Sequence, residues 1–294
     1  MCSAWRTTMF KKTFRISEPA RPDSADLSNT RNILDETASR RVNWLIHVSF
    51  HWRSLPGKAN LALASTLALL HTSPTLTPLF TSLCRKHLPQ TEIFHMVDES
   101  LIQQTIAVGK LQKVTVRRLI GMIESAASIG VDGVLVTCSS IGPATTIAAR
   151  LFPFPVIRVD DAMAEKAVNQ GRRIGVLATL RTTLEPTTAL LREKSAAAGT
   201  STLIEESLCE GAFEAVLAGD TETHDRMVSQ ALMDLVAKVD LVVLAQASMA
   251  RVLQQMPELT VPVLSSPELA VLRTRELLNG HSQALPSSAH ALEF

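Results

Sequence analysis

Of the four cysteines in the chain, Cys138 has the position best suited to chemistry. It follows the apolar residues 134–136 and precedes Ser139, Ser140 and a Gly-Pro pair that predicts the start of a helix. A helix N-terminus lowers the pKa of a thiol, and the thiolate is the form that acts as nucleophile or base. The sequence therefore predicts Cys138 as the principal catalytic residue, with inert packing as the alternative.

Short turns rich in hydroxyl groups follow two further predicted strands, residues 67–70 and 174–177. The hydroxyl-bearing residues of these turns are Thr72, Ser73, Thr179, Thr182 and Thr183. Free backbone N–H groups at a helix N-terminus favour anions, so these turns suit a carboxylate. The alternative for Thr72 and Ser73 is that they only cap the following helix. Arg181 lies in the second turn, where a solvated position is the alternative to binding.

Two acidic pairs, Asp98–Glu99 and Glu205–Glu206, also follow predicted strands and could act as general bases. A structural role is favoured, because carboxylates in the first turn of a helix complement its dipole. The histidines show no metal-ligand spacing, and the chain has no Walker A, GxGxxG or GxSxG motif. The sequence therefore predicts no metal, no nucleotide and no other cofactor.

The chain repeats itself internally. Three segment pairs align at a spacing of 107 or 108 residues: 131–140 with 239–248, 154–157 with 261–264, and 97–101 with 204–208. The repeat places Gln246 at the position of Cys138. It also places Cys209 at the position of Ile102, which predicts that Cys209 packs in the core.

Alternating β-branched runs and helical patterns indicate βαβ units around parallel sheets. Together with the repeat, they predict an α/β fold of two pseudo-symmetric lobes, residues 61–168 and residues 169–294, the second with a C-terminal tail. Ligands bind outside the carboxyl ends of parallel strands. We therefore expect the polar turns of both lobes to form an active site in the cleft between them.

Residues 1–60 differ in composition from the remainder and are expected to form a flexible extension. All three tryptophans lie in this segment, and residues 19–35 are rich in Ser, Pro and Asp. The first 17 residues carry four basic side chains and no acidic one, a pattern also found in organelle presequences. A disordered or loosely docked arm is the favoured interpretation.

The net charge, the apolar runs and the cysteine spacing indicate which partners and which location to expect. The 29 basic and 28 acidic residues give a formal charge of +1, so neither a nucleic acid nor an anionic membrane is expected as a partner. The apolar runs are shorter than the roughly 18 residues that a bilayer span requires. The cysteines show no CxxC spacing, which indicates reduced thiols and a cytoplasmic location.

These features resemble the aspartate/glutamate/hydantoin racemase superfamily, which also includes maleate isomerases and arylmalonate decarboxylases. The resemblance covers about residues 65 to 280, and rests on the two lobes, on residues 137–140 and on residues 244–249. It implies a cofactor-independent isomerase or racemase-type enzyme of amino acid metabolism that acts on a small carboxylated carbon acid. It also implies that a homodimer is one assembly to expect.

In that family, two cysteines on opposite faces of the substrate's α-carbon exchange protons. Here Cys138 matches the first, whereas Gln246 replaces the second. An amide cannot act as a proton base near neutral pH, so the resemblance implies single-cysteine chemistry with Gln246 orienting the substrate. The residues expected to bind the substrate are Thr72, Ser73, Ser139, Ser140, Thr179, Thr182, Thr183 and Ser248, the last standing where many relatives have histidine.

Two alternatives stay open. One is a decarboxylase of a malonate-like acid, in which a single cysteine protonates an enediolate. The single cysteine of the known decarboxylases belongs to the second lobe, so Cys138 would deliver its proton to the opposite face. The other is a non-catalytic homologue that binds a carboxylate, since the second cysteine is missing and a fold does not dictate function.

Overall fold

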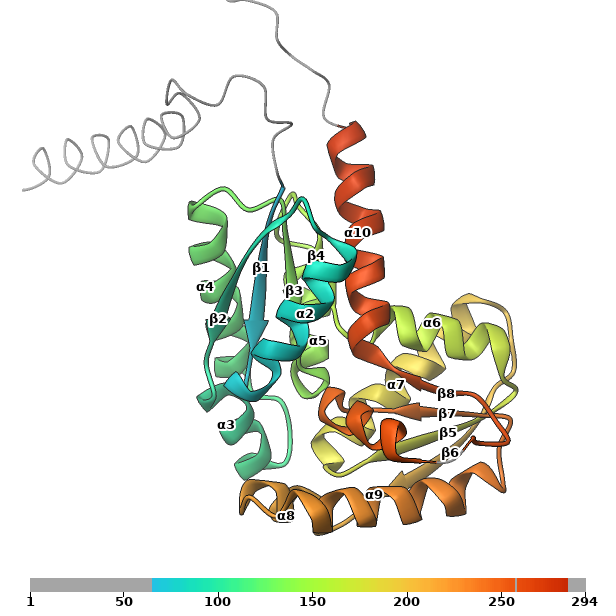
Figure 1. Ribbon diagram of the computed structural model, residues 1–294. Helices are drawn as coiled ribbons and strands as arrows, with labels where there is room; N and C mark the ends of the chain where they lie inside the picture. Colours follow the sequence, from blue (N-terminus) through green and yellow to red (C-terminus); the bar gives the residue numbers. More distant parts are fainter. Residues whose placement is uncertain (1–64, 257, 285–294) are drawn as a thin grey trace, which may run out of the picture. The chain divides into compact units, whose positions relative to one another are not determined.

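The computed structural model describes residues 65–256 and 258–284 of the 294-residue chain (Figure 1). The predicted extension, residues 1–60, and the end of the predicted tail lie outside the described residues. The chain divides into two units, Met1–Ala59 and Asn60–Phe294, and every described residue belongs to the second. None of the helices within the described ranges is long and apolar enough to cross a membrane.

Two four-stranded parallel sheets form the framework (Figure 1). The first has the order β2-β1-β3-β4, with β1 (Thr66–His71), β2 (Glu92–Val97), β3 (Gly133–Val136) and β4 (Val156–Arg158). The second has the order β6-β5-β7-β8, with β5 (Arg173–Ala178), β6 (Leu203–Leu208), β7 (Leu241–Leu244) and β8 (Val263–Ser265). The predicted pair of similar α/β lobes is confirmed.

Helices make the crossovers that parallel strands require. In the first half they are η2 (Pro74–Leu76), α2 (Thr77–His87), α3 (Ser100–Val108), α4 (Lys113–Ser128), η3 (Ser139–Ile141), α5 (Gly142–Ala148) and α6 (Asp161–Gln170). In the second half they are α7 (Arg181–Ala197), α8 (Ala212–Leu217), α9 (Thr221–Val236), η4 (Ala247–Gln255) and α10 (Ser266–Ala284). The central strands β3 and β7 are buried at every position, as expected for strands covered on both faces.

The same hydrogen bonds begin both lobes. A carboxylate oxygen of Asp132 accepts from the backbone N–H of Thr66 at 2.8 Å, and Asp240 accepts from Arg173 at 2.9 Å. Each aspartate precedes the third strand of its lobe and ties it to the first. The alignment of residues 131–140 with 239–248 is therefore correct.

The alignment of residues 97–101 with 204–208 is wrong. His71 pairs with Val97 and Ala178 pairs with Leu208, so Leu208 is the true counterpart of Val97. The spacing changes because α7 has 17 residues whereas α2 has 11. Consequently Glu205 and Glu206 lie inside β6 rather than after it. A helix-length difference of this kind shifts the register without leaving a signal in a short sequence match.

Two helices pack on the sheet of the other lobe. Met163 and Ala167 of α6 contact the core of the second sheet, whereas Val271 and Leu278 of α10 contact that of the first. Gly133 in β3 leaves room for this contact, because a Cβ there would meet Leu278 at 3.0 Å. In Figure 1, α6 lies beside the second sheet and α10 runs along the first. The predicted division at residue 168 places most of α6 in the first lobe and α10 in the second, although each helix packs on the sheet of the other lobe.

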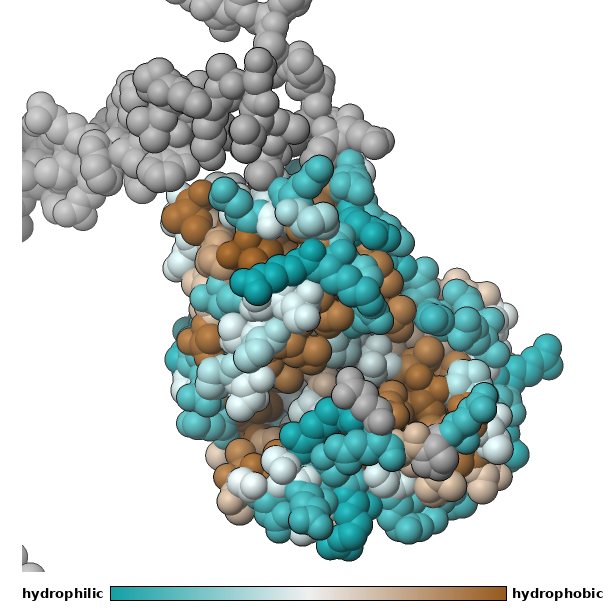
Figure 2. All heavy atoms as spheres, viewed as in Figure 1, coloured by the Kyte–Doolittle hydropathy of each residue, from teal (hydrophilic) through white to brown (hydrophobic). Residues whose placement is uncertain are grey.

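Apolar residues on the viewed face lie in several groups among hydrophilic ones (Figure 2). The large exposed apolar side chains come from separate elements, among them Leu151, Leu203, Leu217 and Met233. Exposed apolar residues of this kind are usual on folded proteins. The homodimer expected from the resemblance stays a prediction.

Candidate active site

The carboxyl ends of both sheets carry the side chains singled out in the sequence. Thr72 and Cys138 follow the neighbouring strands β1 and β3, and Thr179 and Gln246 follow the neighbouring strands β5 and β7. The expected convergence of polar turns at these strand ends is therefore present in each lobe.

Cys138 is the N-cap of η3 and has extended backbone angles, φ −121° and ψ 115°. Its side chain is partly buried against the apolar core of the first lobe. The hydroxyl of Thr72, the backbone N–H groups of Ser140 and Ile141, and the Ser140 hydroxyl lie beside the sulfur and act to lower the pKa of the thiol as potential hydrogen-bond donors. These are the donors that a thiolate requires.

Burial nevertheless raises the pKa of the Cys138 thiol, and the hydrogen bonds from Thr72, Ile141 and Ser140 only oppose this effect. Desolvation disfavours the charged form of an acid, and here it exceeds the donors at the helix N-terminus. The donors of the turn act in the predicted direction, but burial outweighs them. Burial favours the thiol form, and the donors favour the thiolate once it forms.

Gln246 has nearly the same backbone conformation as Cys138, with φ −122° and ψ 136° at the N-cap of η4. Its amide oxygen accepts from the backbone N–H of Thr179 at 2.6 Å and lies 3.1 Å from the Thr179 hydroxyl. The amide nitrogen donates to that hydroxyl at 2.7 Å. Since a backbone N–H can only donate, it fixes which end of the amide is oxygen.

The two lobes thus place equivalent pairs at equivalent strand ends. In the first lobe a threonine hydroxyl lies beside a thiol, Thr72 beside Cys138. In the second lobe a threonine bonds an amide, Thr179 with Gln246. Only the first pair contains a group that can exchange a proton near neutral pH.

A hydrogen bond joins the turn that follows Cys138 to the N-terminus of α7. The hydroxyl oxygens of Ser140 and Thr183 lie 2.7 Å apart, and both side chains are buried. The N-cap of α7, Leu180, has no side chain that could cap the helix, so the N–H groups of its first turn lack this partner. The predicted meeting of turns from both lobes occurs here.

Thr182 lies beside Thr183 in the first turn of α7. Its hydroxyl oxygen is buried and has no hydrogen-bond partner among the described residues. Buried hydroxyl groups nearly always have a partner, so an unpaired one beside uncapped helix N–H groups indicates a place for an acceptor. Arg181, the next residue toward the N-terminus, is exposed.

The remaining predicted binding residues are less informative. Ser73 accepts a hydrogen bond from the backbone N–H of Thr75 at 3.4 Å, which is the capping role considered as its alternative. Ser139 is buried within η3, and Ser248 is partly buried within η4. Their contacts with a substrate stay predictions.

One member of each acidic pair has a structural contact. Asp98 accepts from the backbone N–H of Ser100 at 3.1 Å and forms an ion pair with Arg118. Glu206 lies 3.3 Å from Arg192. Within residues 65–256 and 258–284, no group of three or more His, Cys, Asp and Glu side chains could hold a metal.

The other two described cysteines are buried and free. Burial raises the pKa of Cys84 to about 11 and also raises that of Cys209. Cys209 directly follows β6, where its N–H donates to Ala178, so it matches Asp98 and not Ile102. Its expected packing in the core is confirmed, although by a different register.

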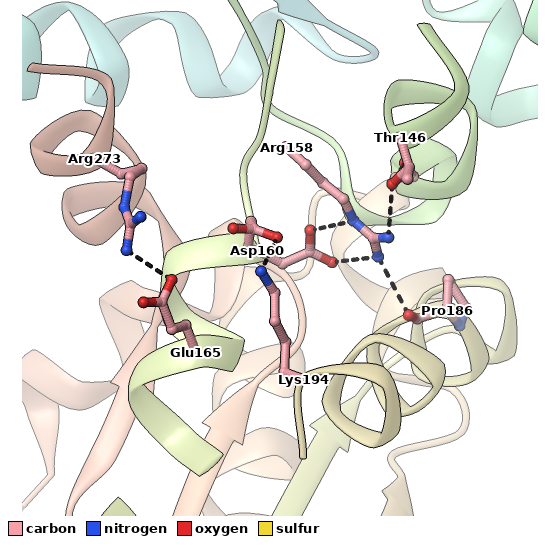
Figure 3. Close-up of polar contacts among 9 residues, drawn as sticks. Thr146, Arg158, Asp160, Glu165, Pro186, Lys194 and Arg273 are labelled. Carbon is pink, nitrogen blue, oxygen red and sulfur yellow. Dashed lines mark hydrogen bonds and ion pairs between the residues drawn. The ribbon is translucent and has the colours of Figure 1, made fainter. Parts of the chain in front are cut away.

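A buried ion pair escaped the sequence analysis. The guanidinium of Arg158 donates from Nε and Nη2 to both carboxylate oxygens of Asp160, at 2.7 and 3.0 Å (Figure 3). Nη2 also donates to the carbonyl oxygen of Pro186 in α7, at 3.2 Å. Arg158 packs on Gly142, where a Cβ would lie 2.6 Å from Cζ. The signal was two charges beside Val159 in an otherwise apolar run.

Figure 3 also shows that α6 is anchored by ion pairs. Glu165 of α6 lies 2.7 Å from Arg273 of α10, and Asp161 lies 2.7 Å from Lys194 of α7. Arg158 therefore lies at the centre of a region where α6, α7 and the start of α5 meet. Its guanidinium packs on Gly142, in the turn after Cys138, and donates to the carbonyl oxygen of Pro186 in α7.

A surface cavity of about 480 Å³ lies away from these residues. It is lined by Arg173 and Leu203, the first residues of β5 and β6, and by Lys238. This is the amino-terminal end of the second sheet, opposite to Thr179. We assign the active site from the converging side chains and not from this cavity.

Comparison with known proteins agrees with this fold. Residues 69–274 match the family described as Asp/Glu/Hydantoin racemase. A glutamate racemase isoform from Bacillus anthracis has a similar structure, with 20% identity, a TM-score of 0.57, and coverage of 74% of this chain and 82% of its own.

An allantoin racemase from Klebsiella pneumoniae has 19% identity and a TM-score of 0.55, with 74% of this chain and 89% of its own covered. An aspartate racemase from Picrophilus torridus has 16% identity and a TM-score of 0.54, with 74% and 98% covered. No curated protein sequence matches at a significant level. The structural likenesses show the fold, and the match of residues 69–274 to the family shows the family.

Proposed function

Since this chain belongs to the Asp/Glu/Hydantoin racemase family, we propose that it is a cofactor-independent isomerase acting on a small carboxylated carbon acid. Cys138 acts as acid, base or nucleophile. The observation that carries the proposal is the set of donors from Thr72, Ser140 and Ile141 around the sulfur, joined to α7 through Thr183.

The substrate carboxylate binds at the N-terminus of α7. The unpaired Thr182 hydroxyl and the backbone N–H groups of Arg181 and Thr182 donate to it, and the helix dipole favours its charge. This places the carbon next to the carboxylate near the Cys138 turn, because Thr183 contacts Ser140. Exposed Arg181 is not required.

Two reactions fit the site, and both begin from the thiolate that forms when the Cys138 thiol gives its proton to solvent. In the first, Cys138 removes the α-proton, so that the sulfur becomes a thiol and the substrate an enediolate, and a proton then returns to the carbon. In the second, the thiolate adds to a carbon–carbon double bond, the resulting single bond rotates, and the thiolate leaves. Neither reaction needs an oxidant or a metal, and backbone donors stabilise the anionic oxygen in both.

The Gln246–Thr179 pair restricts proton transfer to one face. An amide has no proton to take or give near neutral pH, and its oxygen and nitrogen both contact Thr179. This favours a second candidate, decarboxylation of a malonate-like acid. In that reaction the bond to the leaving carboxylate breaks, carbon dioxide departs, and the Cys138 thiol protonates the enediolate from one face.

Product analysis by proton NMR in deuterium oxide distinguishes the candidates. The purified chain is incubated with a panel of amino acids, maleate and substituted malonates. Deuterium at the α-carbon of an acid that keeps all of its carboxylates, or conversion of maleate to its trans isomer, supports the isomerase. Loss of carbon dioxide supports the decarboxylase. Ligand-induced thermal stabilisation without any product would contradict both and indicate a protein that only binds carboxylates.

The matched variants are Cys138→Ser and Cys84→Ala. Serine keeps the size and hydrogen bonds of residue 138 but loses the acidic thiol, so turnover should fall by at least about a hundredfold. Cys84 lies on α2 in the core, so its variant should lose stability but keep turnover. Equal turnover by the wild type and Cys138→Ser would refute the assignment of Cys138.

A further inference from the structure

A chain of hydrogen bonds runs behind the catalytic turn and uses residues that the proposed reaction does not. His71, the last residue of β1, is buried. Its Nδ1 lies 2.8 Å from the Thr137 hydroxyl, and its Nε2 lies 2.8 Å from Nδ1 of His95 in β2. Nε2 of His95 lies 3.0 Å from the Thr81 hydroxyl of α2.

Both ends of the chain reach backbone carbonyl oxygens. The Thr137 hydroxyl lies 3.1 Å from the oxygen of Leu70, and the Thr81 hydroxyl lies 2.8 Å from that of Thr77. The second contact is the usual bond of a helical threonine to the residue four before it. The order is therefore carbonyl, hydroxyl, two imidazoles, hydroxyl, carbonyl.

The number of hydrogens does not match the number of contacts. The chain has five contacts, whereas two hydroxyls and two neutral imidazoles carry four hydrogens. Burial, and next the neighbouring His95, lowers the pKa of His71 to about 4, and burial also lowers the pKa of His95. Both rings are thus neutral at pH 7, and one contact lacks a hydrogen.

The distances indicate which of the five contacts lacks a hydrogen. The Leu70 oxygen already accepts the backbone N–H of Thr137 at 2.9 Å, and its distance to the Thr137 hydroxyl is longer than that between Thr81 and Thr77. We therefore assign the hydrogen of the Thr137 hydroxyl to the contact with Nδ1 of His71. Both histidines must then carry their hydrogen on Nε2, since each Nδ1 accepts.

We propose that His71 and His95 are positioning residues for Cys138, and that the hydrogen count of this chain fixes both rings as Nε2–H tautomers. His71 acts through the two residues next to it in space and sequence. Thr137, its hydrogen-bond partner, directly precedes Cys138, and Thr72, its neighbour in the chain, lies beside the Cys138 sulfur. The pair thereby joins the ends of β1 and β3 behind the thiol.

Thr81 allows a test far from the thiol. Thr81→Val removes one hydrogen and two contacts, so three hydrogens remain for three contacts. All three are made only when Thr137 donates to Leu70 and both rings donate from Nδ1. The tautomers of His71 and His95 should therefore reverse in Thr81→Val. Thr81→Ser keeps the hydroxyl and should keep Nε2–H.

Nitrogen-15 NMR of the histidine-labelled full chain at pH 7 reads the tautomers, with His71→Asn and His95→Asn used for assignment. Nε2–H rings in the wild type and Thr81→Ser, and Nδ1–H rings in Thr81→Val, support the proposal. An Nδ1–H ring in the wild type, or unchanged tautomers in folded Thr81→Val, would overturn it. Neither outcome depends on a substrate.

The positioning role is tested by alkylation of Cys138 with iodoacetamide, followed for its own peptide by mass spectrometry. In His71→Asn the amide oxygen can still accept from Thr137, so the rate constant should stay within about twofold of the wild type. His71→Leu loses this contact and should change the rate by at least about fivefold, as loss of one hydrogen bond implies. Equal rates in all three proteins would exclude a positioning role.

Discussion

Removing the guanidinium of Arg158 should destabilise the protein more than any exposed ion-pair substitution. In Arg158→Met, the carboxylate of Asp160 loses both of its bonds to the guanidinium while its side chain remains fully buried. Leaving one charge of a buried pair without its partner destabilises a protein by about 3–5 kcal/mol. This is a large part of the roughly 5–15 kcal/mol that stabilises a folded domain.

Urea unfolding followed by far-ultraviolet circular dichroism measures the effect. The control is Lys86→Met, which removes an exposed partner of Glu268 and should change the free energy of unfolding by less than about 1 kcal/mol.

A double variant separates charge burial from simple loss of packing. Arg158→Met with Asp160→Asn has no buried charge left unpaired, so it should recover a substantial part of the lost stability. An Arg158→Met loss below about 1 kcal/mol would refute the reasoning. The reasoning would also be refuted if adding Asp160→Asn to Arg158→Met lowered the stability by as much as Asp160→Asn lowers that of the wild type.

Three further outcomes follow from the structure. Gly142→Ala should destabilise by about 1–3 kcal/mol in urea unfolding, because its Cβ would overlap the Arg158 guanidinium, and the loss should shrink in an Arg158→Met background. Since burial raises the thiol pKa values of Cys138 and Cys84, both should alkylate more slowly at pH 7 than a model peptide and faster as pH rises; faster alkylation of Cys138 at pH 7 would contradict its burial. Hydrogen bonds from Lys86 and His87 lower the pKa of Glu268 in the folded protein. The contribution of Glu268 to stability is therefore present above the pKa of the unfolded state and is lost as pH falls through the lower folded value. The unfolding midpoints of Glu268→Gln and the wild type should converge in acid, and a difference that stays constant with pH would contradict the pairing.

Strand and turn positions were predictable because they depend on local chemistry. The apolar runs ending near Leu70, Val136 and Leu177 are strands that the structure confirms, and the polar turns follow them. The match of residues 131–140 with 239–248 correctly made Gln246 the counterpart of Cys138. Each of these inferences needed only a short segment and its immediate neighbours.

Features that depend on contacts between elements distant in sequence could not be predicted. Helical periodicity shows that α6 and α10 have an apolar side, but not that each covers the sheet of the other lobe. Likewise, the thiol pKa of Cys138 depends on burial by residues distant in sequence, which exceeds the local effect of the helix N-terminus. The bonds of Arg158 to Pro186 and of His71 to His95 join separate elements for the same reason.

The central claim is that Cys138 carries carbon-acid chemistry. The most direct measurement is the rate of deuterium incorporation at the α-carbon, by proton NMR, for the wild type, Cys138→Ala and Cys84→Ala with the most active acid of the panel. We predict that exchange is lost in Cys138→Ala and retained in Cys84→Ala. Exchange at the wild-type rate in folded Cys138→Ala would contradict the claim.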